Sequence, residues 1–433
     1  MRYHGIFFFC CVTAFWGTEN GMGADMRHKF YFLIQQITWV AFLLLTLFAV
    51  KSFGRALPDE IYVPFGEKAD YRFGVPVSVT LKDDSEEVFY RMNGQSDTAA
   101  EAPFYTVTCK LFGIFPVKDV KVMMVDRQAV YAGGEAIGIY VKTSGVLVIG
   151  TSEVERPDGS EAAPAENILK AGDYILSVNG EKVAEKEDLQ RLVQQNGAEK
   201  EILKINRKGE EVEVSVTPVQ NKNGTYMLGA WVRDDLAGIG TLTYYKEDGT
   251  YGALGHAVSD GDVGERIQMR EGYVYNAQII GVKKGQKGNP GELSGMIRYQ
   301  SADCLGTIEE NTDIGIYGKL DGNIAALPRG DYYNICYKQD IKQGPATIIC
   351  GFTGEKKEYA IEIESLDYSG REANKGILFR VTDEQLLDMT GGIVQGMSGS
   401  PILQDGKIIG AVTHVFVSDS SMGYGIFIEN MVE

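Results

Sequence analysis

A serine in a glycine-rich run near the C-terminus is the residue best suited to covalent chemistry. The run Gly391–Ile402 reads GGIVQGMSGSPI and places Ser398 inside the pattern G-x-S-G-x-P. A nucleophilic serine must project from a tight turn whose own N–H groups point into the site, and neighbouring glycines permit that backbone. We therefore expect Ser398 to be the nucleophile, with the N–H groups of Gly396 and Ser398 forming an oxyanion hole. Ser400, in the same run, is the alternative nucleophile.

A serine nucleophile needs a base, and histidine is scarce in this chain. Of the four histidines, His4 and His28 precede or adjoin a long apolar segment, which leaves His256 and His414. His256 lies at the end of an expected strand upstream of Ser398, which is the order of chymotrypsin-like peptidases. We expect His256 to accept the serine proton. His414 lies in an apolar run, which favours a place in the pocket wall or the core.

A carboxylate that holds the imidazole in one tautomer would complete the site. Asp383 is the first choice, since only a short turn separates it from the serine loop. Asp313 is the alternative with the more trypsin-like chain order, and Asp260 and Asp262 lie close to His256 along the chain. At each Asp the competing interpretation is a turn or a helix cap. The sequence Asp-Glu-Gln-Leu from Asp383 is typical of an N-cap.

The elements that must position these residues are mostly short strands. From residue 226 to residue 433, short apolar stretches alternate with Gly-rich turns, and strong helical periodicity is confined to about residues 383–390. This pattern predicts a β-barrel domain, and the form of the serine loop makes it a trypsin-like serine peptidase domain. Residues 57–120 predict a small β-rich segment. The expected fold class is mainly β.

Residues 121–220 follow a different pattern, which resembles a PDZ domain over nearly its full length. The most specific part is the run 171–183, AGDYILSVNGEKV, in which a Gly-Asp turn and an Asn-Gly turn bracket a strand. In a PDZ domain an extended peptide adds beside a strand, and backbone N–H groups capture a C-terminal carboxylate. The resemblance implies that Ile137, Gly138 and Ile139 form this carboxylate-binding loop and contact peptide. The alternative is a PDZ domain that only scaffolds its neighbour.

An apolar segment near the N-terminus predicts a transmembrane helix. Phe30–Val50 contains no charged residue and is about as long as the ~20 residues that cross a bilayer. Arg27, His28 and Lys29 precede it, so the positive-inside rule puts the N-terminus in the cytoplasm and the rest of the chain outside. No A-x-A-like cleavage site follows, which favours an uncleaved signal-anchor over residues 26–56. We interpret residues 1–25 as a start-site extension.

The composition excludes several function classes. The formal net charge is −17, which argues against nucleic acid as a partner because phosphate binding needs a basic surface. None of the six cysteines lies in a CxxC pair, so we expect neither a metal site nor a cofactor. Free or buried thiols are expected, with a disulfide between Cys336 and Cys350 as the alternative.

Taken together, these features resemble the stage IV sporulation protein B peptidase family of endospore-forming Firmicutes over about residues 57–433. The runs that carry the resemblance are GALGHAVSD, KGNPGE, NTDIGIYG and TGGIVQGMSGSPILQDGKIIGAVTHVF. The resemblance implies a nucleophile at Ser398 in GMSGSP, a base at His256 in GALGHAV and an orienting carboxylate at Asp383 in FRVTDEQLL.

The same resemblance implies a role. A peptidase of this family works in the space between the forespore and mother-cell membranes, where it cleaves itself and a regulatory membrane protein. That cleavage releases a downstream intramembrane protease. The implied partners are peptide segments of the membrane-protein substrate, the chain itself through its PDZ domain, and the membrane through the N-terminal helix.

Two other function classes fit parts of the sequence. A non-catalytic PDZ adaptor would keep the peptidase fold without the reaction, and the intact Ser398 and His256 argue against it. A general envelope quality-control protease of the DegP type carries its PDZ domain after the catalytic domain. Here the PDZ-like region comes first, which disfavours that class.

Overall fold

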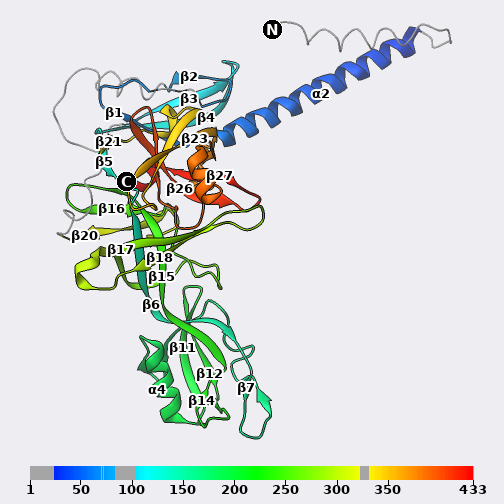
Figure 1. Ribbon diagram of the computed structural model, residues 1–433. Helices are drawn as coiled ribbons and strands as arrows, with labels where there is room; N and C mark the ends of the chain where they lie inside the picture. Colours follow the sequence, from blue (N-terminus) through cyan, green and yellow to red (C-terminus); the bar gives the residue numbers. More distant parts are fainter. Residues whose placement is uncertain (1–23, 70, 72, 83–103, 322–330, 433) are drawn as a thin grey trace.

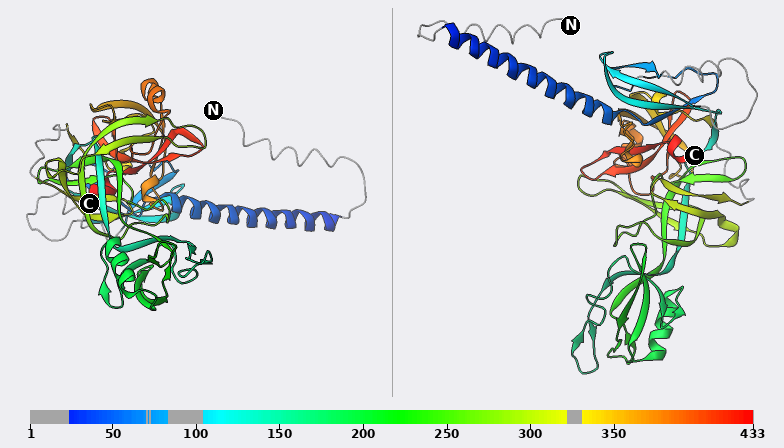
Figure 2. Two further views of the ribbon diagram at one scale, coloured as in Figure 1. Left: turned by 60° about the horizontal axis from the view of Figure 1, so that its bottom comes forward. Right: turned by 180° about the vertical axis from the view of Figure 1, so that it is seen from behind.

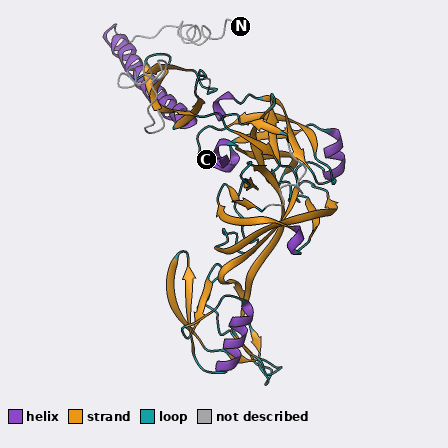
Figure 3. Cartoon of the chain, turned by 90° about the vertical axis from the view of Figure 1, so that its left-hand side faces the viewer, coloured by secondary structure: helices purple, strands orange, loops and turns teal. Residues whose placement is uncertain are grey.

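The chain is built mainly from strands, as the sequence predicts (Figure 3). The structure is a computed structural model that describes residues 24–69, 71, 73–82, 104–321 and 331–432. A long helix and a small sheet lie at one end, two β-barrels in the middle, and a smaller module at the other end (Figure 1, Figure 2). The predicted start-site extension, residues 1–25, lies almost wholly outside the described residues.

The N-terminal helix α2 spans Ala24–Ala56 and projects away from the rest of the chain (Figure 1). Its segment Phe30–Ala56 contains an 18-residue stretch with a mean hydropathy of 2.0, and none of that stretch is buried against protein. At ~1.5 Å per residue this segment exceeds the ~30 Å of a bilayer core. An apolar helix of this length near the N-terminus is consistent with a membrane anchor or a signal sequence.

A four-stranded sheet follows the helix, in the order β1-β4-β3-β2. β1 runs parallel to β4, and the other pairs are antiparallel. This sheet rests on the second barrel, where the ring of Tyr62 stacks on Tyr337 at 6.0 Å between centroids. The bounds are Glu60–Pro64 (β1), Val77–Leu81 (β2), Phe104–Leu111 (β3) and Phe115–Val125 (β4).

The first barrel is a closed ring in which β6 pairs with both β17 and β15, and β19, β20 and β16 complete the circle. Its core holds Ile137, Ile139, Leu254 and Ile316 among other buried apolar side chains. The bounds are Ala136–Thr151 (β6), Ala230–Tyr245 (β15), Thr250–Ala253 (β16), Met269–Lys283 (β17), Cys304–Thr312 (β19) and Gly315–Leu320 (β20), with Ala129–Ala132 (β5), Glu292–Ile297 (β18), Ser301–Asp303 (η2) and Tyr332–Asn334 (β21) beside it.

The smaller module is the PDZ domain. Its sheet continues from the far half of β6 through β9 and β11 to β12, and helix α4 packs its buried Leu189, Leu192 and Val193 against the same core. The bounds are Val154–Glu155 (β7), Glu161–Ala162 (β8), Tyr174–Val178 (β9), Glu181–Lys182 (β10), Lys186–Asn196 (α4), Glu201–Arg207 (β11), Glu210–Val216 (β12), Val219–Gln220 (β13) and Tyr226–Met227 (β14).

The second barrel closes in the order β22-β23-β24-β27-β26-β25. Its core includes the fully buried Phe379 and Ile402. The bounds are Lys338–Asp340 (η4), Gly344–Cys350 (β22), Lys357–Leu366 (β23), Ala373–Lys375 (η5), Ile377–Val381 (β24), Glu384–Thr390 (α5), Pro401–Gln404 (β25), Lys407–Phe416 (β26), Asp419–Phe427 (β27) and Glu429–Val432 (α6).

The placement of Ile137, Gly138 and Ile139 differs from the sequence-based expectation. These residues lie inside β6, where they pair with β17 on one edge and with β15 on the other. Ile137 and Ile139 are buried in the core of the first barrel. Because neither edge of the strand is free at this point, no peptide can add beside it, and we correct the prediction that these three residues form a carboxylate-binding loop.

The boundaries of the PDZ domain also differ from the predicted range 121–220. Residues up to Val125 belong to β4 of the N-terminal sheet, and the first half of β6 belongs to the first barrel. The PDZ domain is therefore inserted between two strands of that barrel, β6 and β15. Both strands run without interruption from one domain into the other (Figure 1).

Candidate active site

Ser398 and His256 line one cavity of about 580 Å³ between the two barrels. Ser398 belongs to the loop that leads from α5 into β25 of the second barrel, whereas His256 follows β16 of the first barrel. The cavity is walled mainly by apolar side chains, and His414 of β26 also faces it. The sequence-predicted nucleophile and base therefore meet at the boundary of the barrels, from distant parts of the chain.

Two glycines shape the serine loop. Gly396 and Gly399 have φ angles of +99° and +98°, a backbone region that favours glycine. A Cβ at Gly399 would also collide with the carbonyl oxygen of Thr241 on β15. Thr241 in turn fixes the loop, because its N–H donates to the Ser398 carbonyl (3.0 Å) and its hydroxyl donates to the Gly396 carbonyl (2.8 Å).

The N–H groups of this loop fall into two sets. Those at positions 397 and 400 donate to backbone carbonyls within the loop, and that of Gly399 donates to the Val412 carbonyl on β26. The N–H groups of Gly396 and Ser398 have no acceptor within the part of the chain that the structure describes. Two unused donors on either side of Met397, in a loop that lines the cavity, are what an oxyanion hole requires.

The two serines of the loop have different surroundings. Ser398 is half-buried at the cavity, and its hydroxyl donates to the Thr413 carbonyl at 3.0 Å. Ser400 is fully buried, with its Oγ 3.2 Å from the thiol of Cys350 in the core of the second barrel. Only Ser398 lines the cavity, so the geometry favours it over Ser400.

The chain approaches His256 through a tight turn. Leu254 and Gly255 both have a φ of +71°, which is unusual for a leucine. Nδ1 of His256 lies 2.8 Å from the carbonyl oxygen of Ala257. A carbonyl only accepts, so Nδ1 carries the proton and Nε2 of the neutral ring is left as the basic atom. Burial lowers the pKa of His256, which favours that neutral form near pH 7.

His414 lies beside His256 in the wall of the same cavity. Its ring centroid is 5.4 Å from that of His256. Burial, followed by the neighbouring His256 and Lys375, lowers the pKa of His414 to about 4. Its Nδ1 is buried and has no hydrogen-bond partner among the described residues. The sequence-based interpretation of His414 as part of the pocket wall agrees with this placement.

Asp383 does not line the cavity. Its Oδ1 accepts the Leu386 N–H at 2.9 Å and its Oδ2 the Ala360 N–H at 3.4 Å, so it acts as the N-cap of α5. The serine loop begins directly after this helix, at Gly391. In this structure the carboxylate is used by backbone N–H groups and not by His256.

The other candidate carboxylates are also engaged elsewhere. Asp313 is exposed and lies 3.3 Å from the guanidinium of Arg266. Asp260 is buried and paired with Arg233, which also contacts Asp262 at 3.2 Å. Within the described part of the chain, no carboxylate is hydrogen-bonded to His256.

The cysteines lie apart from the site chemistry. Cys109, Cys304, Cys336 and Cys350 are free thiols, so the disulfide considered between Cys336 and Cys350 is not formed. Burial raises the pKa of the Cys350 thiol to about 12, which keeps it protonated beside Ser400.

Comparisons with known proteins identify both domains. Residues 224–432 match the family described as SpoIVB peptidase S55, and residues 157–207 match the PDZ domain family. No curated protein matches the chain.

Two solved structures are similar at low identity. The PDZ domain of the SdrC-like protein from Listeria monocytogenes is 18% identical over 21% of this chain and 87% of that one, with a TM-score of 0.18. AlgW, an HtrA-type protease solved with a decapeptide, is 11% identical over 69% of this chain and 61% of its own length, with a TM-score of 0.26. These scores are too low to support an argument from either structure.

The two family matches agree with the predicted peptidase domain and with the predicted PDZ domain. Residues 224–432 belong to the SpoIVB peptidase S55 family, and the chain is a serine peptidase that carries a PDZ domain.

Proposed function

We propose that this protein is a membrane-anchored serine endopeptidase in which Ser398 is the nucleophile and His256 the general base. The observation that supports this most directly is the single cavity that Ser398 and His256 share. In the proposed reaction Oγ of Ser398 attacks the peptide carbonyl while its proton passes to Nε2 of His256. The N–H groups of Gly396 and Ser398 stabilise the oxyanion, and His256 then protonates the leaving amine. Water hydrolyses the acyl-enzyme by the same route.

One resting contact must change for this reaction. The Ser398 hydroxyl donates to the Thr413 carbonyl, and a hydroxyl has only one proton to donate. A rotation about the Cα–Cβ bond of Ser398 redirects that proton towards His256. Such catalytic hydrogen bonds often form only in the substrate complex.

We propose Asp383 as the carboxylate that orients His256, and the family resemblance supports this role. The carboxylate caps α5 in the resting structure. The proposal therefore requires Asp383 to leave the Leu386 and Ala360 N–H groups and turn to His256 when substrate binds. A carboxylate there stabilises the imidazolium, which the neutral Ala257 carbonyl does only weakly.

The proposed substrates are peptide segments of a regulatory membrane protein and of the chain itself. The PDZ domain supports this proposal because PDZ domains bind extended peptides. The apolar helix α2 supports a reaction beside a membrane. In a sporulating cell we place the catalytic domain between the forespore and mother-cell membranes, where cleavage activates a downstream intramembrane protease.

The experiment uses the full chain in lipid vesicles and separates the two serines. We expect a fluorophosphonate probe to label the wild type and Ser400→Ala but not Ser398→Ala. A tagged Ser398→Ala chain should be cleaved when mixed with wild type or with Ser400→Ala, and left intact by untagged Ser398→Ala. Loss of the nucleophile typically lowers kcat by about 10⁴–10⁶-fold, which sets the size of the difference.

Two results would contradict the proposal. If the probe labels Ser398→Ala and does not label Ser400→Ala, Ser400 is the nucleophile. Labelling as expected without cleavage of the tagged chain would retain the serine peptidase but remove the chain itself from its substrates.

A further inference from the structure

The turn between β3 and β4 carries an exposed apolar patch that the peptidase reaction does not use. Phe112 and Ile114 are each 72% exposed, and Phe115 beside them is 39% exposed. We call these three side chains the apolar turn. A cluster of large apolar side chains in water marks a surface that contacts another molecule or a membrane.

The turn is held in a form that points these side chains outward. Leu111 pairs with Phe115 across the hairpin, and the Ile114 N–H donates to the Leu111 carbonyl at 3.1 Å. Phe112 has a φ of +53°. Leu111 itself is fully buried in the small sheet, so burial of the neighbouring Phe112 and Ile114 is not needed to complete that core.

The apolar turn lies close to the root of helix α2. A Cβ at Gly54 of the helix would lie 3.4 Å from Val117 of β4. The ammonium of Lys118 donates to the Leu57 carbonyl at 2.7 Å and pairs with Asp59 at 2.9 Å. The sheet is thus fixed against the end of the helix, as Figure 1 shows.

Simple geometry places the turn near the membrane surface. Phe115 is two residues from Val117 along β4, so at ~3.3 Å per residue it lies about 7 Å from the contact with Gly54. Gly54 in turn follows Val50, the end of the uncharged stretch, by about 6 Å of helix. The turn therefore lies within about 13 Å of the end of the uncharged stretch, close enough to reach the interfacial layer in which amphipathic segments rest ~5–10 Å deep.

We propose that the apolar turn inserts into the bilayer interface beside α2 and forms a second membrane contact of the exported domain. Aromatic and aliphatic side chains without charge suit this layer. Lys51 and Arg55 are exposed at the end of α2 and suit anionic headgroups on the same side. Continuity with the apolar helix favours lipid over a protein partner. Two contacts, helix and turn, hold the barrels at a fixed height above the membrane.

The test places a tryptophan in the turn of the full chain and measures its distance from lipid. Ile114→Trp is compared with Ile280→Trp, which is 64% exposed on β17 of the first barrel. Both are made in a chain whose three tryptophans are replaced (Trp16→Phe, Trp39→Phe and Trp231→Phe) and reconstituted into phosphatidylcholine vesicles with a minority of phosphatidylglycerol, with and without bromine on the acyl chains. We expect brominated lipid to reduce the added emission of Ile114→Trp by about half, since the ring sits at interfacial depth, and to leave Ile280→Trp unchanged. Iodide in the water should quench them in the opposite order.

Each other outcome overturns the proposal. Equal, weak quenching of Ile114→Trp and Ile280→Trp by brominated lipid would show that the turn stays in water. Iodide access to Ile114→Trp equal to that of Ile280→Trp would show the same. Quenching of Trp39 in a chain that carries Trp16→Phe and Trp231→Phe tests the anchor separately. If brominated lipid quenches Trp39 but not Ile114→Trp, α2 is a membrane anchor and the turn does not contact the membrane. If Trp39 is not quenched, both fail.

Discussion

At the scale of single residues, the orientation of His256 rests on its own neighbour in the chain. The Ala257 carbonyl accepts a hydrogen bond from Nδ1–H, with 2.8 Å between the nitrogen and the oxygen, and this contact alone selects the tautomer that a general base needs. A neutral carbonyl offers little stabilisation to the imidazolium that forms during the reaction. A carboxylate at this site would therefore act mainly through its negative charge, which stabilises the imidazolium, and less by selecting the tautomer of the neutral ring.

Replacing Asp383 with asparagine separates its two candidate roles. Asn caps helices about as well as Asp, so Asp383→Asn should keep α5 and the fold. If the carboxylate turns to His256 in the substrate complex, kcat should fall by up to about 10⁴-fold. Steady-state kinetics on a peptide substrate, with circular dichroism as the check on folding, measures both. Asp313→Asn is the matched control, because that exposed side chain only pairs with Arg266.

A near-normal kcat in Asp383→Asn would assign this residue to the helix cap alone. A crippled Asp313→Asn beside it would move the orienting role to Asp313. Loss of kcat in both variants would point to a general effect of charge around the site.

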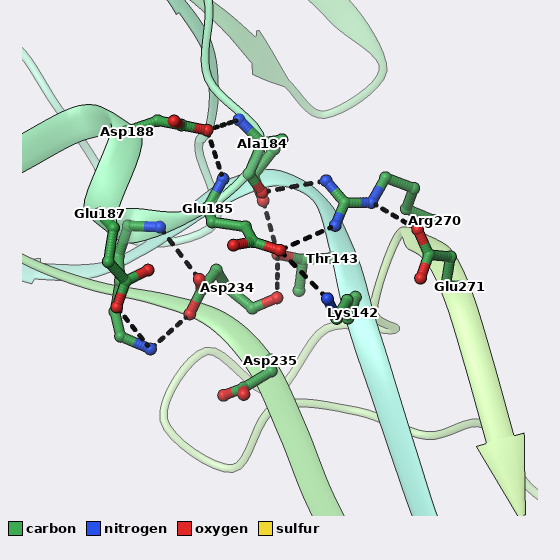
Figure 4. Close-up of polar contacts among 12 residues, drawn as sticks. Lys142, Thr143, Ala184, Glu185, Glu187, Asp188, Asp234, Asp235, Arg270 and Glu271 are labelled. Atoms are coloured by element: carbon green, nitrogen blue, oxygen red, sulfur yellow. Dashed lines mark hydrogen bonds and ion pairs between the residues drawn. The ribbon is translucent and has the colours of Figure 1, made fainter. Parts of the chain in front are cut away.

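At the scale of elements, the start of α4 is fixed to the barrel strands at the junction of the two domains (Figure 4). The pairing of β6 with β15 shifts register next to Asp234, which is buried. The carboxylate of Asp234 accepts the Lys186 N–H and ammonium, both at 2.9 Å. Burial raises the pKa of Asp234, but the hydrogen bonds from Lys186 outweigh it and the net pKa is lowered.

Further polar contacts surround this pair. The Thr143 hydroxyl lies 3.0 Å from the Asp234 carbonyl, and Arg270 of β17 donates to the Ala184 carbonyl at 3.2 Å. Lys142 of β6 pairs with Glu185 at 3.1 Å. Together these contacts connect the helix to β6, β15 and β17, so the orientation of the PDZ domain depends on them.

Removing the Asp234 carboxylate should loosen the start of α4. Asp234→Ala leaves the Lys186 N–H without its partner, and since Lys186 is 40% exposed we expect a loss of about 1–2 kcal/mol. Hydrogen exchange should then be faster at the first turn of α4 than in the barrels. Glu187→Ala is the control, because Glu187 is exposed and makes only a long contact of 3.9 Å with the Lys186 ammonium. Equal exchange in the two variants would show that the junction does not depend on Asp234.

The sequence predicted some of these elements and missed others for physical reasons. The cap at Asp383 and the serine loop are local, since side-chain oxygens and glycines act on residues within a few positions. The strand that carries Gly138 is not local. Its Gly-containing apolar pattern suits a carboxylate-binding loop as well as a buried strand, and only pairing with β15 and β17 decides between them. The approach of His414 to His256 is likewise set by tertiary packing, because the two residues lie on different barrels.

At the scale of the whole molecule, the PDZ domain is not joined by a flexible linker. β6 leaves the first barrel and enters the PDZ sheet, and β15 returns beside it. Residues Ala230–Arg233 of β15 pair with Leu147–Thr151 of β6 inside the PDZ domain, and later residues of the same two strands pair inside the barrel. Two domains that share a pair of strands cannot separate without breaking that pairing.

We therefore expect the PDZ domain and the peptidase domain to unfold together. Trp231 is 64% exposed at the PDZ end of β15, so it reports on that domain, while fluorophosphonate labelling of Ser398 reports on the barrels. In a chain with Trp16→Phe and Trp39→Phe, both signals should be lost at one guanidinium midpoint, as in a cooperative transition. Asp234→Ala provides the contrast, since a weakened junction should move the Trp231 midpoint more than the labelling midpoint. Two separate midpoints in the chain without that substitution would show that the shared strands do not couple the domains, and that the PDZ domain moves as an independent module.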